Sequence, residues 1–166
     1  MVKEATSYKI ITDSMSNHMT MATLIAADLT KTPVTVQVSQ DKNDHGYPQL
    51  VLGNGTKLHY AYAIGSFLAS ESSSTHNLLG KTPFERLQVD QYAAIASTLQ
   101  AVSYIEDRAF GVKKNDNPQD LKNARTKIEE IVRNLDNHLK GNKKFLVGES
   151  ITLADILMFC TLMTSY

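Results

Sequence analysis

The most informative stretch of the sequence is Phe145-Leu146-Val147-Gly148-Glu149-Ser150-Ile151-Thr152-Leu153-Ala154-Asp155-Ile156. Thr152 is placed to cap a helix, and Asp155, three residues later, is placed to accept a hydrogen bond from the backbone N–H of Thr152. The carboxylate would also lie near the positive end of the helix dipole, where a negative charge is favourable. Ile151 and Ile156 flank this start and predict an apolar contact across it. The stretch therefore predicts a helix that begins directly after Thr152 and is held by local contacts.

The rest of the second half of the chain also has a helical pattern. Thr82-Pro83-Phe84-Glu85 combines a capping threonine, a proline at the first helical position and a glutamate three residues after the cap. The helix that starts there is expected to run to about residue 107, with these side chains facing inward: Leu87, Tyr92, Ile95, Leu99 and Val102. Asn117-Pro118 predicts the start of another helix, which should end at Gly141 and bury one stripe: Ala124, Ile128, Ile131, Val132, Leu135 and Leu139.

The first half alternates short strand and helix patterns. Tyr8–Thr12 and Val34–Val38 have the composition of strands, and a helix between them should place Met21, Leu24, Ile25 and Leu29 on one side. Its candidate caps are Asp13, Ser14, Ser16 and Asn17. Two short strands around Gly53-Asn54-Gly55 predict a β-hairpin, and residues 61–69 predict the helix after it. The Ser-rich residues 70–77 indicate a linker between the two halves.

The composition excludes several classes of function. The chain has 166 residues, and its 17 Lys and Arg balance its 17 Asp and Glu, so no strong general attraction to nucleic acid or anionic membrane is expected. The single cysteine, Cys160, forms no intramolecular disulfide, and the five histidines lack metal-ligand spacing. The N-terminus does not resemble a signal peptide, and the apolar residues 151–163 are too few to cross a bilayer. These features predict a cytoplasmic protein without a metal.

Three segments carry a resemblance to a known family. Residues 47–69, with Gly53-Asn54-Gly55 in the middle, resemble the later part of the thioredoxin-like half of glutathione transferases, and residues 145–156 are similar to the capping segment of their helical half. Residues 79–83 fit the same pattern. The resemblance implies an α/β thioredoxin-like domain over residues 1–70, a linker over 71–81 and an all-α domain over 82–166. It also implies a cis bond before Pro48 and a buried folding role for Asp155.

Two departures from the family argue against catalysis. Glutathione transferases usually hold the γ-glutamyl end of glutathione with an acidic residue followed by serine, and Tyr60-Ala61 stands at those positions. The segment between Val38 and Tyr47 is also too short for the usual second helix. Ser14 and Ser16 could stabilise a thiolate, but we interpret them as helix caps. Cys160 lies on the apolar side of a helix and is interpreted as a buried hydrophobic residue. We therefore expect neither a catalytic residue nor a bound cofactor.

The shortened first half resembles the appended N-terminal domains of cytosolic glutamyl- and methionyl-tRNA synthetases and the scaffold proteins of multisynthetase complexes. The second half is similar to the elongation-factor-one gamma subunit as well, and the sequence leaves these relatives open. The resemblance implies a scaffold for protein biosynthesis that pairs with another glutathione-transferase-like domain, as a homo- or heterodimer, and meets tRNA only indirectly. By the family's dimer geometry, Tyr62, Ser66 and Tyr92 are expected near that interface. A glutathione-dependent transferase is the alternative, and we expect the chain to be part of a longer protein.

Overall fold

The computed structural model describes residues 8–40, 46–72, 74–110 and 118–163. The elements are β1 (Tyr8–Thr12), α1 (His18–Leu29), β2 (Val34–Val38), β3 (Gln49–Val51), β4 (Lys57–His59), α2 (Ala61–Glu71), α3 (Pro83–Phe110), α4 (Pro118–Leu139) and α5 (Leu153–Leu162). The expected order of strand, helix, strand, hairpin and helix is confirmed. The sequence predicts a solvated face around the basic pair Lys113-Lys114, because acidic residues nearby offset the charge, and this pair lies outside the described residues.

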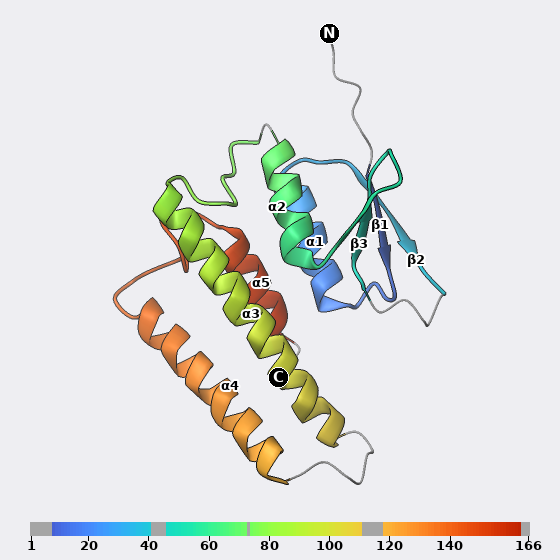
Figure 1. Cartoon of the computed structure of the whole chain (residues 1–166). Coiled ribbons are helices and arrows are strands. Elements are labelled where there is room, and N and C mark those ends of the chain that lie inside the picture. The colour runs from blue at the N-terminus through green and yellow to red at the C-terminus, as the bar shows by residue number, and fades with distance from the viewer. Residues whose placement is uncertain (1–7, 41–45, 73, 111–117, 164–166) are drawn as a thin grey trace.

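The four strands form one mixed sheet in the order β2-β1-β3-β4. β1 and β2 run parallel, whereas β3 is antiparallel to both β1 and β4. The Gly53-Asn54-Gly55 turn joins β3 to β4, as the hairpin signal predicted. Figure 1 shows α1 and α2 side by side against the sheet, with the long helices of the second half beyond them. The chain is therefore a thioredoxin-like α/β unit followed by a helical unit.

The buried face of α1 differs from the expected one. Met21, Leu24, Ile25 and Leu29 are only half-buried, and the residues most removed from solvent are small: Thr20, Ala22, Thr23, Ala26 and Ala27. The reason is that α1 packs against both α2 and α5, so small side chains are needed where the helices approach most closely. Its cap is Asn17, whose side chain accepts from the backbone N–H groups of Met19 and Thr20.

The linker expected over residues 71–81 lies between two helices, because α2 extends to Glu71 and α3 begins at Pro83. Two of its serines are tied to the end of α1. The Ser72 hydroxyl donates to the carbonyl of Thr30 at 2.7 Å, and the Ser74 hydroxyl donates to the carbonyl of Leu29 at 3.0 Å. The Ser-rich composition therefore attaches the connection to the first unit.

In the helical unit, α3 packs against both α4 and α5. Its buried residues are Val89, Ala93, Ala96 and Leu99, with Tyr92, Ile95 and Val102 half-buried beside them. The expectation for Leu87 was wrong, because its side chain is 65% exposed. α3 also runs to Phe110, slightly beyond the expected end, and α4 ends before Gly141, as expected.

The capping segment before α5 has the geometry that the sequence predicted. One Asp155 carboxylate oxygen accepts from the backbone N–H of Leu146 at 2.8 Å. The other accepts from the backbone N–H of Thr152 at 2.9 Å and from its hydroxyl at 3.1 Å. Asp155 therefore joins the start of α5 to the loop before it. The Tyr47–Pro48 peptide bond is cis, as the resemblance implied.

Candidate functional site

A cleft of about 180 Å³ lies between the two units. Its walls come from the start of α1, the residue before Pro48, the start of α2, one side of α3 and α5. The residues that line it are Met19, Tyr47, Tyr60, Ala61, Tyr62, Ala93, Ala96, Ser97, Gln100 and Leu157. None of these side chains carries a formal charge, and three of them are tyrosines.

The start of α2 forms the wall where the sequence departs from the glutathione transferases. Tyr60 precedes the helix with φ 68° and ψ 132°, and its side chain makes no capping hydrogen bond. A positive φ is costly for a bulky residue, by about 1–3 kcal/mol, and such positions are frequent at binding sites. Ala61 follows at the first helical position and is buried. The backbone is thus held in an uncommon conformation, while the side chains at its tip are an exposed phenol and a methyl group.

Tyr62 links the two units across the edge of this cleft. Its hydroxyl donates a hydrogen bond to the Asp90 carboxylate on α3. Burial, together with this hydrogen bond, raises the pKa of Tyr62, so the hydroxyl keeps its proton at neutral pH. Ser66 lies one turn further along α2 and is half-buried. Two of the three residues expected at an interface therefore lie together on α2.

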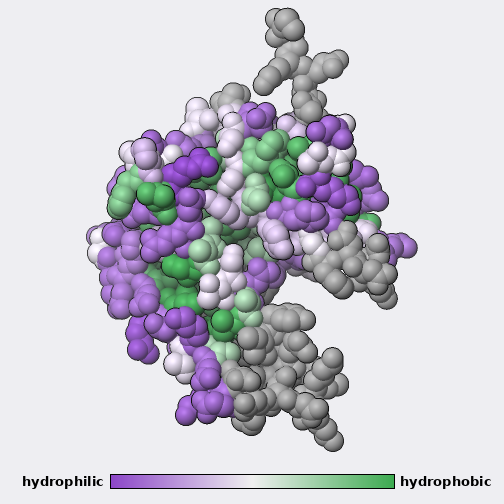
Figure 2. Space-filling view, in the orientation of Figure 1, coloured by the Kyte–Doolittle hydropathy of each residue, from purple (hydrophilic) through white to green (hydrophobic). Residues whose placement is uncertain are grey.

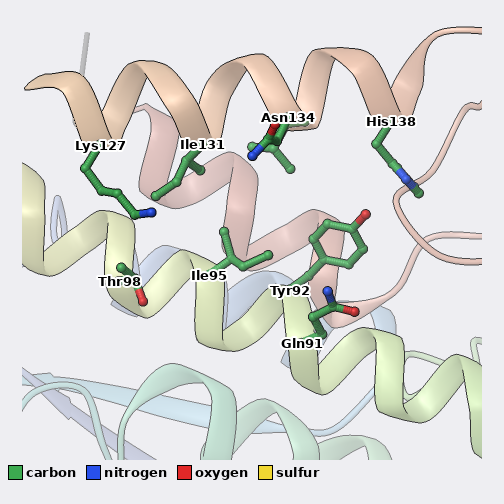
Figure 3. A pocket seen from close by; sticks show the side chains of 9 residues that line it. Gln91, Tyr92, Ile95, Thr98, Lys127, Ile131, Asn134 and His138 are labelled. Atoms are coloured by element: carbon green, nitrogen blue, oxygen red, sulfur yellow. The ribbon is translucent and has the colours of Figure 1, made fainter.

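The third residue, Tyr92, lines a different cavity. This groove of about 490 Å³ lies between α3 and α4 and is lined by Gln91, Tyr92, Ile95, Thr98, Lys127, Ile131, Asn134, Leu135 and His138. Figure 3 shows the Tyr92 ring pointing from α3 toward α4. Its centroid lies 5.5 Å from that of His138, whose Nε2 donates to the carbonyl of Leu146 at 2.9 Å. Tyr62, Ser66 and Tyr92 therefore do not form one patch.

An exposed ridge runs along α3 between the cleft and the groove. It consists of Phe84, Leu87, Gln91, Ala94, Thr98 and Ala101, all of which are exposed and none of which is charged. Phe84 is 69% exposed and Leu87 is 65% exposed. In Figure 2, hydrophobic residues lie in separate patches over the helical unit, with hydrophilic residues around them. We call these six residues the α3 ridge.

The α3 ridge was missed in the sequence because Leu87 was assigned to the core. The pattern that would have found it is present, since all six residues recur at helical spacing on the side opposite Val89, Ala93 and Ala96. By contrast, the exposed surface of α4 carries charges of both signs, including the ion pairs Lys127–Glu130 and Lys140–Asp136, each 3.0 Å long. Large exposed apolar residues that lie together on a surface are typical of a protein-binding site.

The other candidate residues have structural explanations. The hydroxyls of Ser14 and Ser16 hydrogen-bond to each other at 2.8 Å, and neither caps α1, so their interpretation as caps was wrong. Cys160 is buried, and burial raises the pKa of its thiol. No cluster of three or more potential metal ligands occurs among the residues that the structure describes. In the described helices, no segment is both long enough and apolar enough to cross a bilayer.

Residues 92–166 match the family model of the glutathione S-transferase C-terminal domain. The chain is 37% identical over 95 residues to elongation factor 1-gamma of Rattus norvegicus, which covers 56% of this chain and 21% of the relative. It is 31% identical over 121 residues to elongation factor 1-gamma of Artemia salina, which covers 72% of this chain and 26% of the relative. The chain therefore spans about a quarter or less of the length of these relatives.

The solved structures show the same architecture. The glutathione S-transferase of Methylobacillus flagellatus with glutathione bound superposes with a TM-score of 0.80 at 20% identity, covering 93% of this chain and 81% of that one. The enzyme of Pseudomonas fluorescens gives a TM-score of 0.75 at 20% identity, covering 95% of this chain and 84% of that one. The chain thus has the glutathione S-transferase fold, with a glutathione S-transferase C-terminal domain in its second half.

Proposed function

We propose that this chain is a non-catalytic glutathione-transferase-like domain of the cytosolic translation machinery. It docks its parent protein, or an associated factor, into a translation complex by pairing with another domain of the same fold. The observation that carries the proposal is the chemistry of the cleft, where Tyr60 and Ala61 replace the acidic residue and the serine of the enzymes. None of the described side chains that line the cleft is charged.

The cleft is poorly suited to a charged tripeptide. Glutathione carries an ammonium and two carboxylates at neutral pH, and buried charges need charged or hydrogen-bonding partners to offset the loss of water. The side-chain hydrogen-bonding groups along the cleft are tyrosine hydroxyls, Ser97 and Gln100, and the hydroxyl of Tyr62 is already bonded to Asp90. None of the described side chains along the cleft can neutralise either end of the ligand.

The α3 ridge supports the docking part of the proposal. Phe84 and Leu87 present large apolar side chains to solvent beside the hydrogen-bonded pair Tyr62–Asp90. Aromatic residues such as phenylalanine are enriched at protein interfaces, and the buried core of an interface is more apolar than the rest of the surface. Pairing through the ridge and the adjacent side of α2 would form an interface of standard size, about 1,600 Å² in total.

The relatives favour one parent among those that the sequence resemblance left open. The curated relatives described above are elongation factor 1-gamma, not aminoacyl-tRNA synthetases. They support the proposal that the parent is a translation subunit of the elongation-factor-one gamma type rather than a synthetase. The competing function is a glutathione-dependent transferase. The uncommon backbone conformation of Tyr60 favours it, because such conformations are frequent at binding sites. The side chains of Tyr60 and Ala61 argue against it, because they do not suit glutathione.

Two experiments test the proposal. Titration calorimetry with reduced glutathione should show no saturable binding by the native chain, and Tyr60→Glu with Ala61→Ser should create it if these positions are the cause. Saturable micromolar binding by the native chain would contradict the proposal and favour a glutathione-dependent transferase instead. Capture from cytosol should recover a glutathione-transferase-like translation subunit, lose it with Leu87→Glu, and retain it with Thr126→Glu on the charged face of α4. Recovery that is equal with both variants contradicts the assigned surface.

A further inference from the structure

A second surface lies at the edge of the sheet formed by β2. The strand is the outermost of the order β2-β1-β3-β4, and no further strand lies beyond it among the residues described. Its sequence is Val34-Thr35-Val36-Gln37-Val38, and no residue from Val34 to Gln40 is charged. Open edges are normally protected by charges, prolines or bulges because they can pair with another strand. This edge lacks a charge and has a proline only before it, at Pro33.

The hydrogen-bond pattern shows which groups of β2 face outward. The carbonyl of Pro33 accepts from the N–H of Tyr8 at 3.2 Å, and the N–H of Ser39 donates to the carbonyl of Thr12 at 2.7 Å. The backbone groups of these odd-numbered residues therefore point toward β1. Because peptide groups alternate along a strand, Thr35 and Gln37 also pair with β1. The N–H and C=O groups of the three valines therefore point away from the sheet.

The side chains of the same three valines are incompletely covered. The register of β1 and β2 places Val34, Val36 and Val38 on the helix-bearing face, level with Tyr8, Ile10 and Thr12. The helices cover Ile10 completely, but Val36 is 38% exposed and Val38 is 49% exposed. The outward backbone groups and the uncovered side chains thus belong to the same residues. A strand added to this edge would form hydrogen bonds with the outward backbone groups and would cover the valine side chains.

We propose that β2 pairs with β2 of a second copy of this chain, antiparallel, about a two-fold axis at Val36. The strand is self-complementary in this register, because Val36 meets Val36 of the second copy and Val34 meets Val38 of the second copy. Each of these pairs joins two outward-facing residues and can exchange two backbone hydrogen bonds. Thr35 meets Gln37 of the second copy on the other face, where two uncharged polar side chains are compatible. The two sheets become one continuous sheet.

The occupant follows from the pattern of the strand. A two-fold interface needs a patch that is complementary to itself, and alternating valines with polar residues between them meet this condition on both faces. Figure 1 shows β2 and α3 on opposite sides of the molecule, so self-pairing leaves the α3 ridge open. One dimer would then present two ridges facing outward. The inference is independent of the proposed function, because it uses none of the ridge residues.

Sedimentation equilibrium of the native chain at concentrations from about 5 to 500 µM tests the pairing, since an edge of five residues gives a weak interface. Val36→Lys and Val36→Glu should each shift the chain to monomer, because like charges would then lie opposite each other at the two-fold axis. A mixture of the two variants should restore the dimer, because the opposed charges are then of opposite sign. Thr126→Lys, with the same charge on an exposed site of α4, should leave association unchanged.

The outcomes that overturn the inference are distinct. They are a native chain that stays monomeric over the whole range, Val36 variants that associate like Thr126→Lys, or a mixture that stays monomeric. Loss of association with Leu87→Glu but not with Val36→Lys would assign the contact to the α3 ridge instead. Circular dichroism of each variant confirms that it is folded, and Val36→Pro offers a second test that removes the outward N–H without removing a bond to β1.

An oxidative cross-link checks the register. In a hydrogen-bonded antiparallel pair the Cα atoms lie about 5.5 Å apart, a separation that a disulfide spans. Val36→Cys should therefore form a covalent dimer under mild oxidation. Thr35→Cys should not, because its counterpart in the second copy is displaced along the strand beyond the ~7 Å that a disulfide can bridge. Cys160 does not interfere, since it is 1% exposed. Equal cross-linking of the two variants contradicts the proposed register.

Discussion

Replacing Asp155 with alanine should be among the most destabilising changes in the helical unit. The substitution removes three hydrogen bonds, to the N–H of Leu146 and to the N–H and hydroxyl of Thr152. The two residues that donate are 7% and 2% exposed, so water cannot readily replace the carboxylate at their backbone groups. The threonine hydroxyl can rotate toward another acceptor, but the two backbone donors cannot.

The magnitude follows from those two donors. A hydrogen bond to a charged group contributes about 1.5–3 kcal/mol, and the half-buried carboxylate places each bond near the lower end. We expect Asp155→Ala to lower the free energy of unfolding by about 3 kcal/mol. For a chain of this size that corresponds to a fall in Tm of about 6–12 °C. Asp155→Asn retains one accepting oxygen and should lose about half as much.

Urea denaturation followed by circular dichroism measures the change. The matched control is Asp136→Asn, which removes a carboxylate from an exposed ion pair with Lys140. This control should change the free energy of unfolding by no more than about 0.5 kcal/mol. A loss below about 1 kcal/mol for Asp155→Ala, or one equal to the control, would refute the role assigned to the capping segment.

Three further predictions concern packing, reactivity and pH. A Cβ atom at Gly65 would lie 2.9 Å from the Leu153 side chain, so Gly65→Val should lower stability by about 2–3 kcal/mol in urea denaturation, whereas Ala63→Val on the exposed side of α2 should change it little. Burial raises the pKa of the Cys160 thiol, so a disulfide reagent should label it at least about 100-fold more slowly in the native chain than in urea, and equal rates would contradict its burial. Burial lowers the pKa of His18 below its usual 6.5, so the unfolded chain binds more protons and stability is lost as the pH falls through the folded pKa. His18→Gln should therefore show a smaller fall in Tm between about pH 7 and pH 5 than the native chain, and an unchanged fall would contradict the assignment.

The sequence predicted those features that depend on neighbouring residues. The hairpin around Gly53-Asn54-Gly55, the helix start at Pro83 and the contacts between Thr152 and Asp155 all depend on residues only a few positions apart. These features form wherever the local residues are present, because turn and cap geometry is short-range. The element order and the division into two units followed from them.

The sequence was less informative where two layers compete for one helix. On α1 the largest apolar residues are half-buried, because helices on two sides favour close contact through small residues. On α3 the buried residues are Val89, Leu99 and two alanines, and Leu87 is exposed. Tyr62 and Tyr92 were expected on one surface. Tyr62 contacts the side of α3 that faces α2, through Asp90, whereas Tyr92 lies on the side of α3 that faces α4, about half a turn away. In each case the deciding information is the position of a neighbouring helix.

The contacts that determine the fold and the residues that determine the chemistry of the cleft are separate in this chain. Asp155 joins the start of α5 to the loop before it, and Gly65 permits the approach of α2 to α5. Neither interaction involves the side chains of Tyr60 or Ala61, which lie at the start of α2. The cleft can therefore lose its charged and hydroxyl groups at little cost to stability, whereas the helical packing cannot change in this way.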